Sequence, residues 1–481
     1  MEKEDLVNLV REIQRTKCEG QHIELKKAGK GTPKRLYDSF SSFSNQNGGG
    51  IIIFGIDESQ DFAVTGIQKP QDLQLEVTDQ ALQMEPIVRP VFTLVEIDGK
   101  NILSAEIPEC DSFEKPCYYK GSGKLKGAYV RVGDADLPMT DYEIYRYEAF
   151  KRNLHDELRT VERADASCFD KNLLQEYFSD LRKFKPLLSN QDPDKILHLQ
   201  GMMQNNVPSV AGIMVFAEYP QAFFPQFSVT ALVVDGYEIG DVSENSVRFI
   251  DNQRFEGSVM RMLDDSLNFV RRNTKTATII GEDGKRADRD EYPMLAVREI
   301  ILNALVHRDY SIHSESMPVR IMIFKDRLEV ENPGGLYGRT TVDELGTTAV
   351  PTRNPFLAGA LEVMKVTENR FSGIPTIRTE MKKANLPPAE FIDFRGRFKV
   401  ILRNKAQDEV GYKNLDEDPT TRRILEYCET PRTREEIASV VGVKTVFYVM
   451  NHYVRPLILS GKIQMTIPEK PKSKNQRYVR K

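Results

Sequence analysis

The most regular hydrophobic pattern of the chain lies at residues 295–310, LAVREIILNALVHRDY. Leu, Val and Ile recur there at intervals of three and four residues, which predicts a helix with one broad face packed into a core. Glu299, Asn303 and His307 stand four residues apart, so they project in one line beside that face. This pattern fits a half-exposed helix with a polar edge. It also fits a site for a metal ion and phosphate, because carboxylate, amide and imidazole groups serve such sites.

The pattern after this helix predicts two strands and a tight turn. Residues 319–324 and 327–331 have the length and alternation of strands, and Asn332-Pro333-Gly334-Gly335 then forces a turn. Glycines at that position let a backbone approach a ligand that side chains would block. Further on, Ser372-Gly373 precedes another helical pattern, and the N-terminus of a helix favours phosphate.

The first 150 residues predict a mixed α+β domain. Helical patterns cover residues 4–15 and 34–45, and three glycines then lead into a continuous apolar run at 51–56, typical of a strand buried on both faces. Residues 91–97 and 101–107 flank Asp98-Gly99, which indicates a hairpin. Residues 126–133 form one more predicted strand, on which Arg131 is expected to point outward.

The region 151–290 has patterns of helices and strands but no group of candidate catalytic residues. Helices are predicted at 173–184, 194–201 and 257–273, and strands at 210–216 and 227–234. We interpret this region as a connector that couples the parts on either side of it.

The last domain, at 419–481, follows a polar and acidic linker at 404–418 and predicts a winged helix. Thr433 and Glu436 have capping-box spacing for a second helix, a third helix spans 444–460, and two short strands enclose a Lys-rich loop. The segment holds 13 Lys and Arg against 5 Asp and Glu, which favours nucleic acid over a protein partner. The expected DNA contacts are Lys444, Thr445, Tyr448, Asn451 and His452, with Lys470, Lys472, Lys474 and Arg477 on phosphates.

Composition narrows the class of protein. The chain has 481 residues, 40% of them hydrophobic, and no apolar run near eighteen residues, so we expect a multidomain cytoplasmic protein without a membrane span. Five cysteines without a CxxC pair favour reduced thiols over disulfides or a zinc site.

Glu299 and Asn303, the Asn332-Pro333-Gly334-Gly335 turn and Ser372-Gly373 together resemble the divergent GHKL-type ATPase module of proteins labelled RecG-helicase-related or transcriptional regulators. The resemblance covers about residues 292–402 and implies that ATP and Mg²⁺ bind there. It implies that Glu299 polarises the attacking water and that Asn303 holds the magnesium ion. The implied nucleotide contacts are Glu299, Asn303, Asn332, Gly334, Gly335, Ser372 and Gly373.

Residues 17–135 resemble the Schlafen-AlbA domain, through Glu19 and Glu24-Leu25-Lys26, the SFSNQNGGGIIIFGIDE stretch and YVRVG. The resemblance implies nucleic-acid binding. Carried over from nuclease relatives, it also implies a divalent-metal site at Glu19, Glu24 and Asp57, with Glu58 as a substitute for Asp57. The expected nucleic-acid contacts are Lys26, Lys27 and Arg131. The competing interpretation is that these acids pair with Lys26, Lys27 or Arg131 on a solvated edge.

We therefore expect an α+β multidomain protein. Its parts are a Schlafen-AlbA-like mixed α/β domain (1–150), a connector (151–290), a GHKL-like α/β sandwich (291–403), a linker (404–418) and a C-terminal winged helix (419–481). The favoured function is a nucleic-acid-binding transcriptional regulator, with DNA ahead of RNA, in which a nucleotide biases conformation or homo-oligomerisation. The alternative is a metal-dependent nuclease that acts on RNA or DNA.

Overall fold

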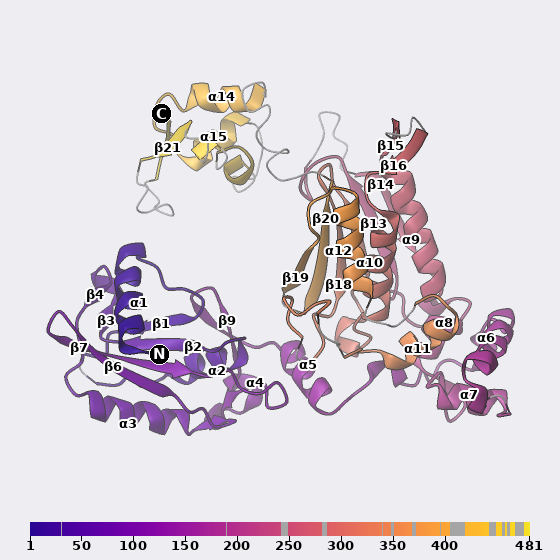
Figure 1. Cartoon of the computed structure of the whole chain (residues 1–481), viewed down its shortest axis with the longest axis horizontal. Helices are drawn as coiled ribbons and strands as arrows, with labels where there is room; N and C mark the ends of the chain where they lie inside the picture. The colour runs from indigo at the N-terminus through magenta and orange to yellow at the C-terminus, as the bar shows by residue number, and fades with distance from the viewer. Residues whose placement is uncertain are drawn as a thin grey trace.

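The structure is a computed structural model of the chain (Figure 1). It describes residues 1–481 except 30, 189, 242–248, 281–285, 339, 348–350, 368–371, 395, 405–418, 442–448, 455–456, 459–461 and 467–475. Within the described part of the chain, no helix is both long and apolar enough to cross a membrane.

The first domain is built on a four-stranded sheet. Its order is β1 (Ile23–Lys26), β2 (Gly50–Phe54), β7 (Lys100–Ile107) and β6 (Val91–Ile97), and only β1 and β2 run parallel. Helix α1 (Lys3–Thr16) packs with Ile53 on one side of the sheet, while α2 (Tyr37–Asn45) and α3 (Pro70–Ala81) pack with Ile52 on the other. The prediction of a strand buried on both faces at this position is confirmed, because successive side chains of β2 enter two different cores.

The second domain is a two-layer sandwich. Its sheet has the order β14 (Phe249–Phe255), β13 (Val229–Val234), β17 (Val319–Ile323), β18 (Arg327–Pro333), β20 (Arg397–Arg403) and β19 (Glu390–Phe394). Helices α9 (Val259–Asn273), α10 (Met294–Val306) and α12 (Gly373–Lys383) cover one face of it (Figure 1). Helix α10 lies in the middle, in contact with both neighbouring helices and with β18, which confirms the predicted core helix.

One predicted strand is wrong. Residues 210–216 form helix α8 (Val210–Phe216), in which every residue is buried. The run VAGIMVF is apolar throughout, and a short apolar run does not distinguish a buried strand from a buried helix. Ser209 decides the outcome locally, because its side chain accepts a hydrogen bond from the backbone N–H of Gly212 and caps the helix.

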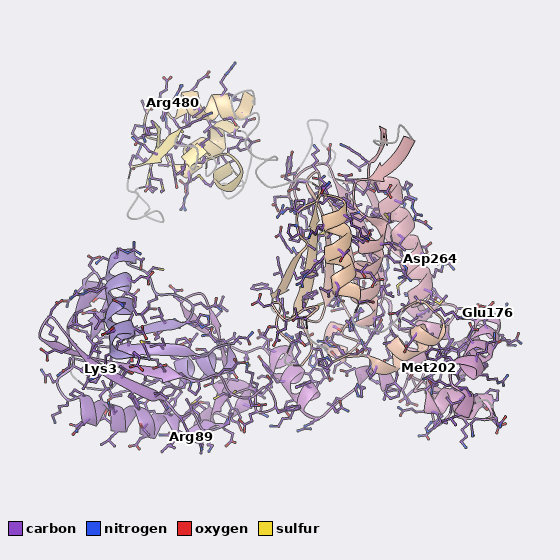
Figure 2. The ribbon with its side chains drawn as sticks, in the orientation of Figure 1. Lys3, Arg89, Glu176, Met202, Asp264 and Arg480 are labelled. Carbon is purple, nitrogen blue, oxygen red and sulfur yellow. The ribbon has the colours of Figure 1, made fainter. Side chains whose placement is uncertain are left out.

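Helices α6 (Lys171–Phe184), α7 (Pro193–Leu199) and α11 (Pro355–Val363) complete the second domain around α8. Figure 2 shows Glu176 of α6 and Asp264 of α9 on the side of this domain that lies away from the first domain. Strands β9 (Tyr129–Val132) and β10 (Ala135–Pro138) lead into α5 (Asp141–Lys151), which connects the two domains.

The C-terminal part contains α14 (Pro419–Tyr427), α15 (Arg434–Val441), a π-helical turn at Met450–Val454 and the antiparallel pair β21 (Ile463–Met465) and β22 (Tyr478–Arg480). The predicted capping box is confirmed, because Thr433 N donates to Glu436 and Glu436 N donates to the Thr433 hydroxyl. Much of the predicted third helix, 444–460, lies outside the described residues. The chain is thus an α+β multidomain protein.

Candidate functional site

A cavity of about 520 Å³ opens in the second domain between α10, the end of β18 and the start of α12. The seven residues expected to contact nucleotide all line it: Glu299, Asn303, Asn332, Gly334, Gly335, Ser372 and Gly373. The sequence separates these residues by up to about seventy positions, and the sheet and its helices bring them to one place.

Helix α10 supplies the floor of this cavity. Its apolar residues from Ala296 onward are buried in the core, whereas Leu295 is exposed, and Glu299 and Asn303 lie on the edge that faces α12. A Cβ atom at Gly373 would lie 3.0 Å from Asn303 Nδ2 and 3.1 Å from Glu299 Oε2, so the amide and the carboxylate both reach the first turn of α12. The first backbone N–H groups of a helix have no partner within it, and its dipole favours an anion there.

The Arg298 guanidinium and the His307 imidazole lie next to Glu299 and Asn303 and determine the charge around them. Arg298 Nη1 lies 3.2 Å from Glu299 Oε1, and its Nη2 donates to Val366 O. Burial, together with the nearby Arg353 guanidinium, lowers the pKa of His307 to about 4. The imidazole is therefore neutral at pH 7 and adds no positive charge to the row of Glu299 and Asn303.

The opposite wall is the end of β18. Asn332 lies on the same face of the strand as Leu328 and Val330, which enter the core, and it is 5% exposed. Among the residues that the structure describes, its buried Oδ1 atom has no hydrogen-bond partner, although Asn332 lines the cavity. A buried polar atom without a partner costs free energy, so this carboxamide is suited to a ligand that completes its hydrogen bonds.

The turn that follows needs glycine. At Gly334 the φ angle is +102°, and a Cβ atom there would lie 2.2 Å from Arg353 Nη1. At Gly335 a Cβ atom would lie 2.2 Å from Asp393 Oδ1. The backbone angle and the close Asp309 backbone thus require glycine at Gly334, whereas a side chain at Gly335 would have to displace the ends of Asp393 and Arg146.

Three charged residues behind this turn were missed by sequence reasoning. Arg353 Nη2 donates to Gly335 O, and its Nη1 lies 3.3 Å from Asp309 Oδ2. Burial alone would raise the pKa of Asp309, but Arg353 and a hydrogen bond from Tyr142 hold it below its ordinary value. The third is Asp393, which accepts a hydrogen bond from Leu336 N. Asp309 lies in the helical pattern at 295–310, whereas no sequence pattern described above includes Arg353 or Asp393.

The acidic residues of the first domain are held by cations of the chain. Arg131, expected to point outward, has a side chain that is only 1% exposed, and this expectation is wrong. Strands β9 and β10 pack against α2, which turns Arg131 inward toward Glu24 Oε2 at 2.8 Å, Asp136 Oδ1 at 3.0 Å and Glu19 Oε2 at 3.9 Å.

The predicted metal ligands of the first domain therefore occupy two environments. Burial and the neighbouring Glu24 raise the pKa of Glu19 to about 7. Asp57, at the end of β3 (Ile56–Asp57), instead faces Lys27 Nζ at 2.5 Å, and hydrogen bonds from Lys27 and Ser59 lower its pKa. Lys26 pairs with Glu24. Among the described residues, no group of three or more His, Cys, Asp or Glu side chains is arranged to hold a metal ion.

One of the predicted DNA contacts at the C-terminus, Arg477, has a described side chain. Arg477 is described and exposed at the start of the last strand, where it donates to Pro431 O. The other predicted contacts lie outside the described residues or, for Asn451 and His452, have side chains that are not described: Lys444, Thr445, Tyr448, Asn451, His452, Lys470, Lys472 and Lys474.

Models of three known families match separate parts of the chain. Residues 19–140 match the family described as "Schlafen, AlbA_2", and residues 316–402 match "Putative ATP-dependent DNA helicase recG C-terminal". The chain carries a Schlafen AlbA_2 domain and a RecG-related ATPase-like domain. Residues 419–479 match the C-terminal domain of "Filamentation induced by cAMP protein Fic-like". The first two matches confirm the resemblances drawn from the sequence.

Solved structures offer weaker likenesses. The DIP2311 protein of Corynebacterium diphtheriae is 18% identical over 100% of this chain and 97% of its own, with a TM-score of 0.40. The N-terminal domain of a putative ATP-dependent DNA helicase RecG-related protein from Nitrosomonas europaea is 28% identical over 28% of this chain and 92% of its own, with a TM-score of 0.23. A Fic family protein from Desulfovibrio desulfuricans G20 is 10% identical over 72% of this chain and 77% of its own, with a TM-score of 0.13. No curated protein matches the chain.

Proposed function

We propose that this protein is a nucleic-acid-binding regulator whose ATPase-like domain binds a magnesium nucleotide in the cavity between α10, β18 and α12. The observation that carries the proposal is the convergence of the seven predicted contacts on that cavity. The cavity also has a different chemistry at each end, which is what a nucleotide requires.

The part of the cavity that would bind the phosphates and the magnesium ion is formed by Glu299, Asn303 and the start of α12. The Asn303 side-chain oxygen is a hard donor suited to Mg²⁺. The N–H groups at Gly373 and just after it are suited to phosphate oxygens, and glycine lets the ligand come close to the backbone. Bound Mg²⁺ would neutralise phosphate charge, and Glu299 is placed to hold or accept a proton of a water molecule beside it.

The base end is formed by Asn332. A carboxamide offers one acceptor and two donors, so it can pair with the adjacent amino group and ring nitrogen of adenine. Phe398 and Val400 of β20 line the same cavity and provide apolar surface for a flat base. These contacts support ATP as the nucleotide.

The two outer domains supply the nucleic-acid contacts in this proposal. The positive charge of residues 419–481 supports DNA binding by the winged helix. The ion pairs of Glu24 with Arg131 and of Asp57 with Lys27 occupy carboxylate oxygens that a metal ion would need, and they favour the regulator over the nuclease. In this function the nucleotide biases the conformation or self-association of the regulator in the cytoplasm.

The test is calorimetric titration of the full-length protein with Mg·ATP. The variants Asn303→Ala and Asn332→Ala are each expected to weaken binding by roughly 10- to 100-fold, since each removes a hydrogen bond or ligand bond in a buried site. Asn268→Ala makes the same chemical change on the exposed face of α9 and serves as the control. Equal affinity in all four proteins would remove this cavity as the nucleotide site.

A second assay separates the two functions. The same protein is mixed with labelled DNA or RNA, with and without Mg²⁺ or Mn²⁺. Retardation of intact DNA supports the regulator, whereas cleavage that is lost in Glu24→Ala would support the nuclease and count against this proposal.

A further inference from the structure

Helix α5 presents two different faces to the two domains. It begins with a complete capping box in which Thr140 and Glu143 exchange hydrogen bonds, so its start is fixed directly after β10. Ile144 and Tyr147 pack with Ala128 and Met139 in a small core of the first domain. The opposite face therefore remains for the ATPase-like domain.

That opposite face is a stripe of three residues spaced by four: Tyr142, Arg146 and Phe150. Each seats against a glycine of the ATPase-like domain, in the order Gly396, Gly335 and Gly338. A Cβ atom on these glycines would lie 2.3 Å from Tyr142 Cε1, 2.7 Å from Arg146 Nη2 and 2.9 Å from Phe150 Cε2. A methyl group at Gly396 or Gly338 would clash with an aromatic ring, and one at Gly335 would displace the Arg146 guanidinium, so the stripe and the glycines fit each other closely.

Hydrogen bonds fix the same contact. Arg146 Nη2 donates to Leu336 O at 2.8 Å, while Leu336 N donates to Asp393 Oδ2 at 3.2 Å. The backbone of Leu336 is therefore held on both sides, and one of the two holders comes from α5. The Tyr142 hydroxyl donates to Asp309 Oδ2 at 2.5 Å, and Asp309 pairs with Arg353.

The inner side of this loop is the wall of the nucleotide cavity. Gly334, Gly335, Leu336 and Tyr337 all line it. The ring of Phe150 also meets the ring of Tyr337 edge-on, with centroids 5.4 Å apart. A displacement of α5 would therefore move the backbone that faces the nucleotide.

We propose that Arg146 is a positioning residue of the nucleotide site, through which the first domain completes the wall of the cavity. Binding of nucleic acid to the first domain and binding of nucleotide to the cavity then depend on each other. This proposal rests on the proposed function for the nucleotide itself. The path toward the first domain's acidic cluster is short, because β10 immediately precedes α5 and carries Asp136, the partner of Arg131.

Linkage makes the effect reciprocal. If nucleic acid bound to the first domain shifts α5, it changes nucleotide affinity by some factor, and the nucleotide must change nucleic-acid affinity by the same factor. Couplings of this kind are commonly about 5- to 150-fold. Arg146→Ala should bring the factor close to one.

The first measurement needs no ligand. Hydrogen–deuterium exchange of the full-length protein is followed for peptides that contain residues 334–337 in wild type, Arg146→Ala, Arg146→Lys and Tyr142→Phe. We expect exchange to be about tenfold faster in Arg146→Ala, because the loop loses the bond that anchors Leu336 O and its N–H groups then open more often, and intermediate in Arg146→Lys. Tyr142→Phe keeps the ring on Gly396 and loses only the hydroxyl bond to Asp309, which pairs with Arg353 behind the loop. This milder variant tests the contact between α5 and the loop if Arg146→Ala fails to fold. Arg152→Ala, at the exposed end of the helix and paired with Glu148, is the control.

The second measurement titrates Mg·ATP with and without a labelled nucleic acid. We expect about tenfold weaker Mg·ATP binding in Arg146→Ala and a coupling factor near one. Wild type that binds no Mg·ATP would overturn the proposed function, while the exchange data would still report on the loop. Exchange in Arg146→Ala equal to that in Arg152→Ala, or an unchanged coupling factor, would overturn the role of Arg146.

Discussion

Glu157 gives a prediction whose magnitude follows from the structure. It lies in a short 3-10 turn (Asp156–Leu158), its side chain is 0% exposed, and it accepts backbone hydrogen bonds at the start of α11. Phe356 N donates to its Oε1 at 2.9 Å and Leu357 N to its Oε2 at 2.7 Å. Burial raises the pKa of this carboxyl from 4.5 to about 7, although both hydrogen bonds act in the opposite direction.

The raised pKa makes stability fall as pH rises. Between the unfolded pKa near 4.5 and the native pKa near 7, the native protein keeps a proton on Glu157 that the unfolded chain has released. The free energy of unfolding therefore falls by about 1.4 kcal/mol for each pH unit, or by about 3 kcal/mol between the two pKa values. About 2 kcal/mol of this loss falls between pH 5.5 and 8. Glu157→Gln does not titrate, and it loses one of the two acceptors at a roughly constant cost of about 1–2 kcal/mol.

The assay is urea unfolding followed by far-UV circular dichroism, since the chain has no Trp to serve as a fluorescent probe. The advantage of wild type over Glu157→Gln should shrink by about 2 kcal/mol from pH 5.5 to 8. Glu162→Gln, at an exposed carboxylate of the same segment, controls for the change of charge alone. A difference that stays constant with pH would refute the reasoning. It would mean that the hydrogen bonds and the helix dipole of α11 outweigh burial and keep the carboxylate ionised.

Three further substitutions test other parts of the structure. Gly373→Ala should leave the fold intact but weaken Mg·ATP binding by about tenfold, because its methyl group would press on Asn303; unchanged affinity in calorimetry would contradict this. Arg131→Met should destabilise the first domain by about 3–5 kcal/mol, because buried carboxylates lose their cation, and a change below about 1 kcal/mol in urea unfolding would show that they are solvated. Gly49→Ala should prevent folding of the first domain, since a Cβ atom would lie 2.1 Å from Ile107 O at a φ angle of +69°; a native circular dichroism spectrum would rule that out.

The sequence by itself determined the features that depend on neighbouring residues. The spacing of apolar residues gave helix α10, with Glu299 and Asn303 on one edge, because a helical period is a local property. The capping box at Thr433 was equally local. The run of isoleucines in β2 identified a strand with two buried faces.

Only the tertiary structure decided the rest, because the same local pattern permits more than one environment. Residues 210–216 are apolar enough for a buried strand or a buried helix, and their packing selected the helix. Arg131 follows strand alternation that does not tell which face is solvent, and α2 turned that face inward. Arg146 lies about 190 residues from the loop it holds. A contact of that kind arises when two surfaces fit, and no spacing along the chain records it.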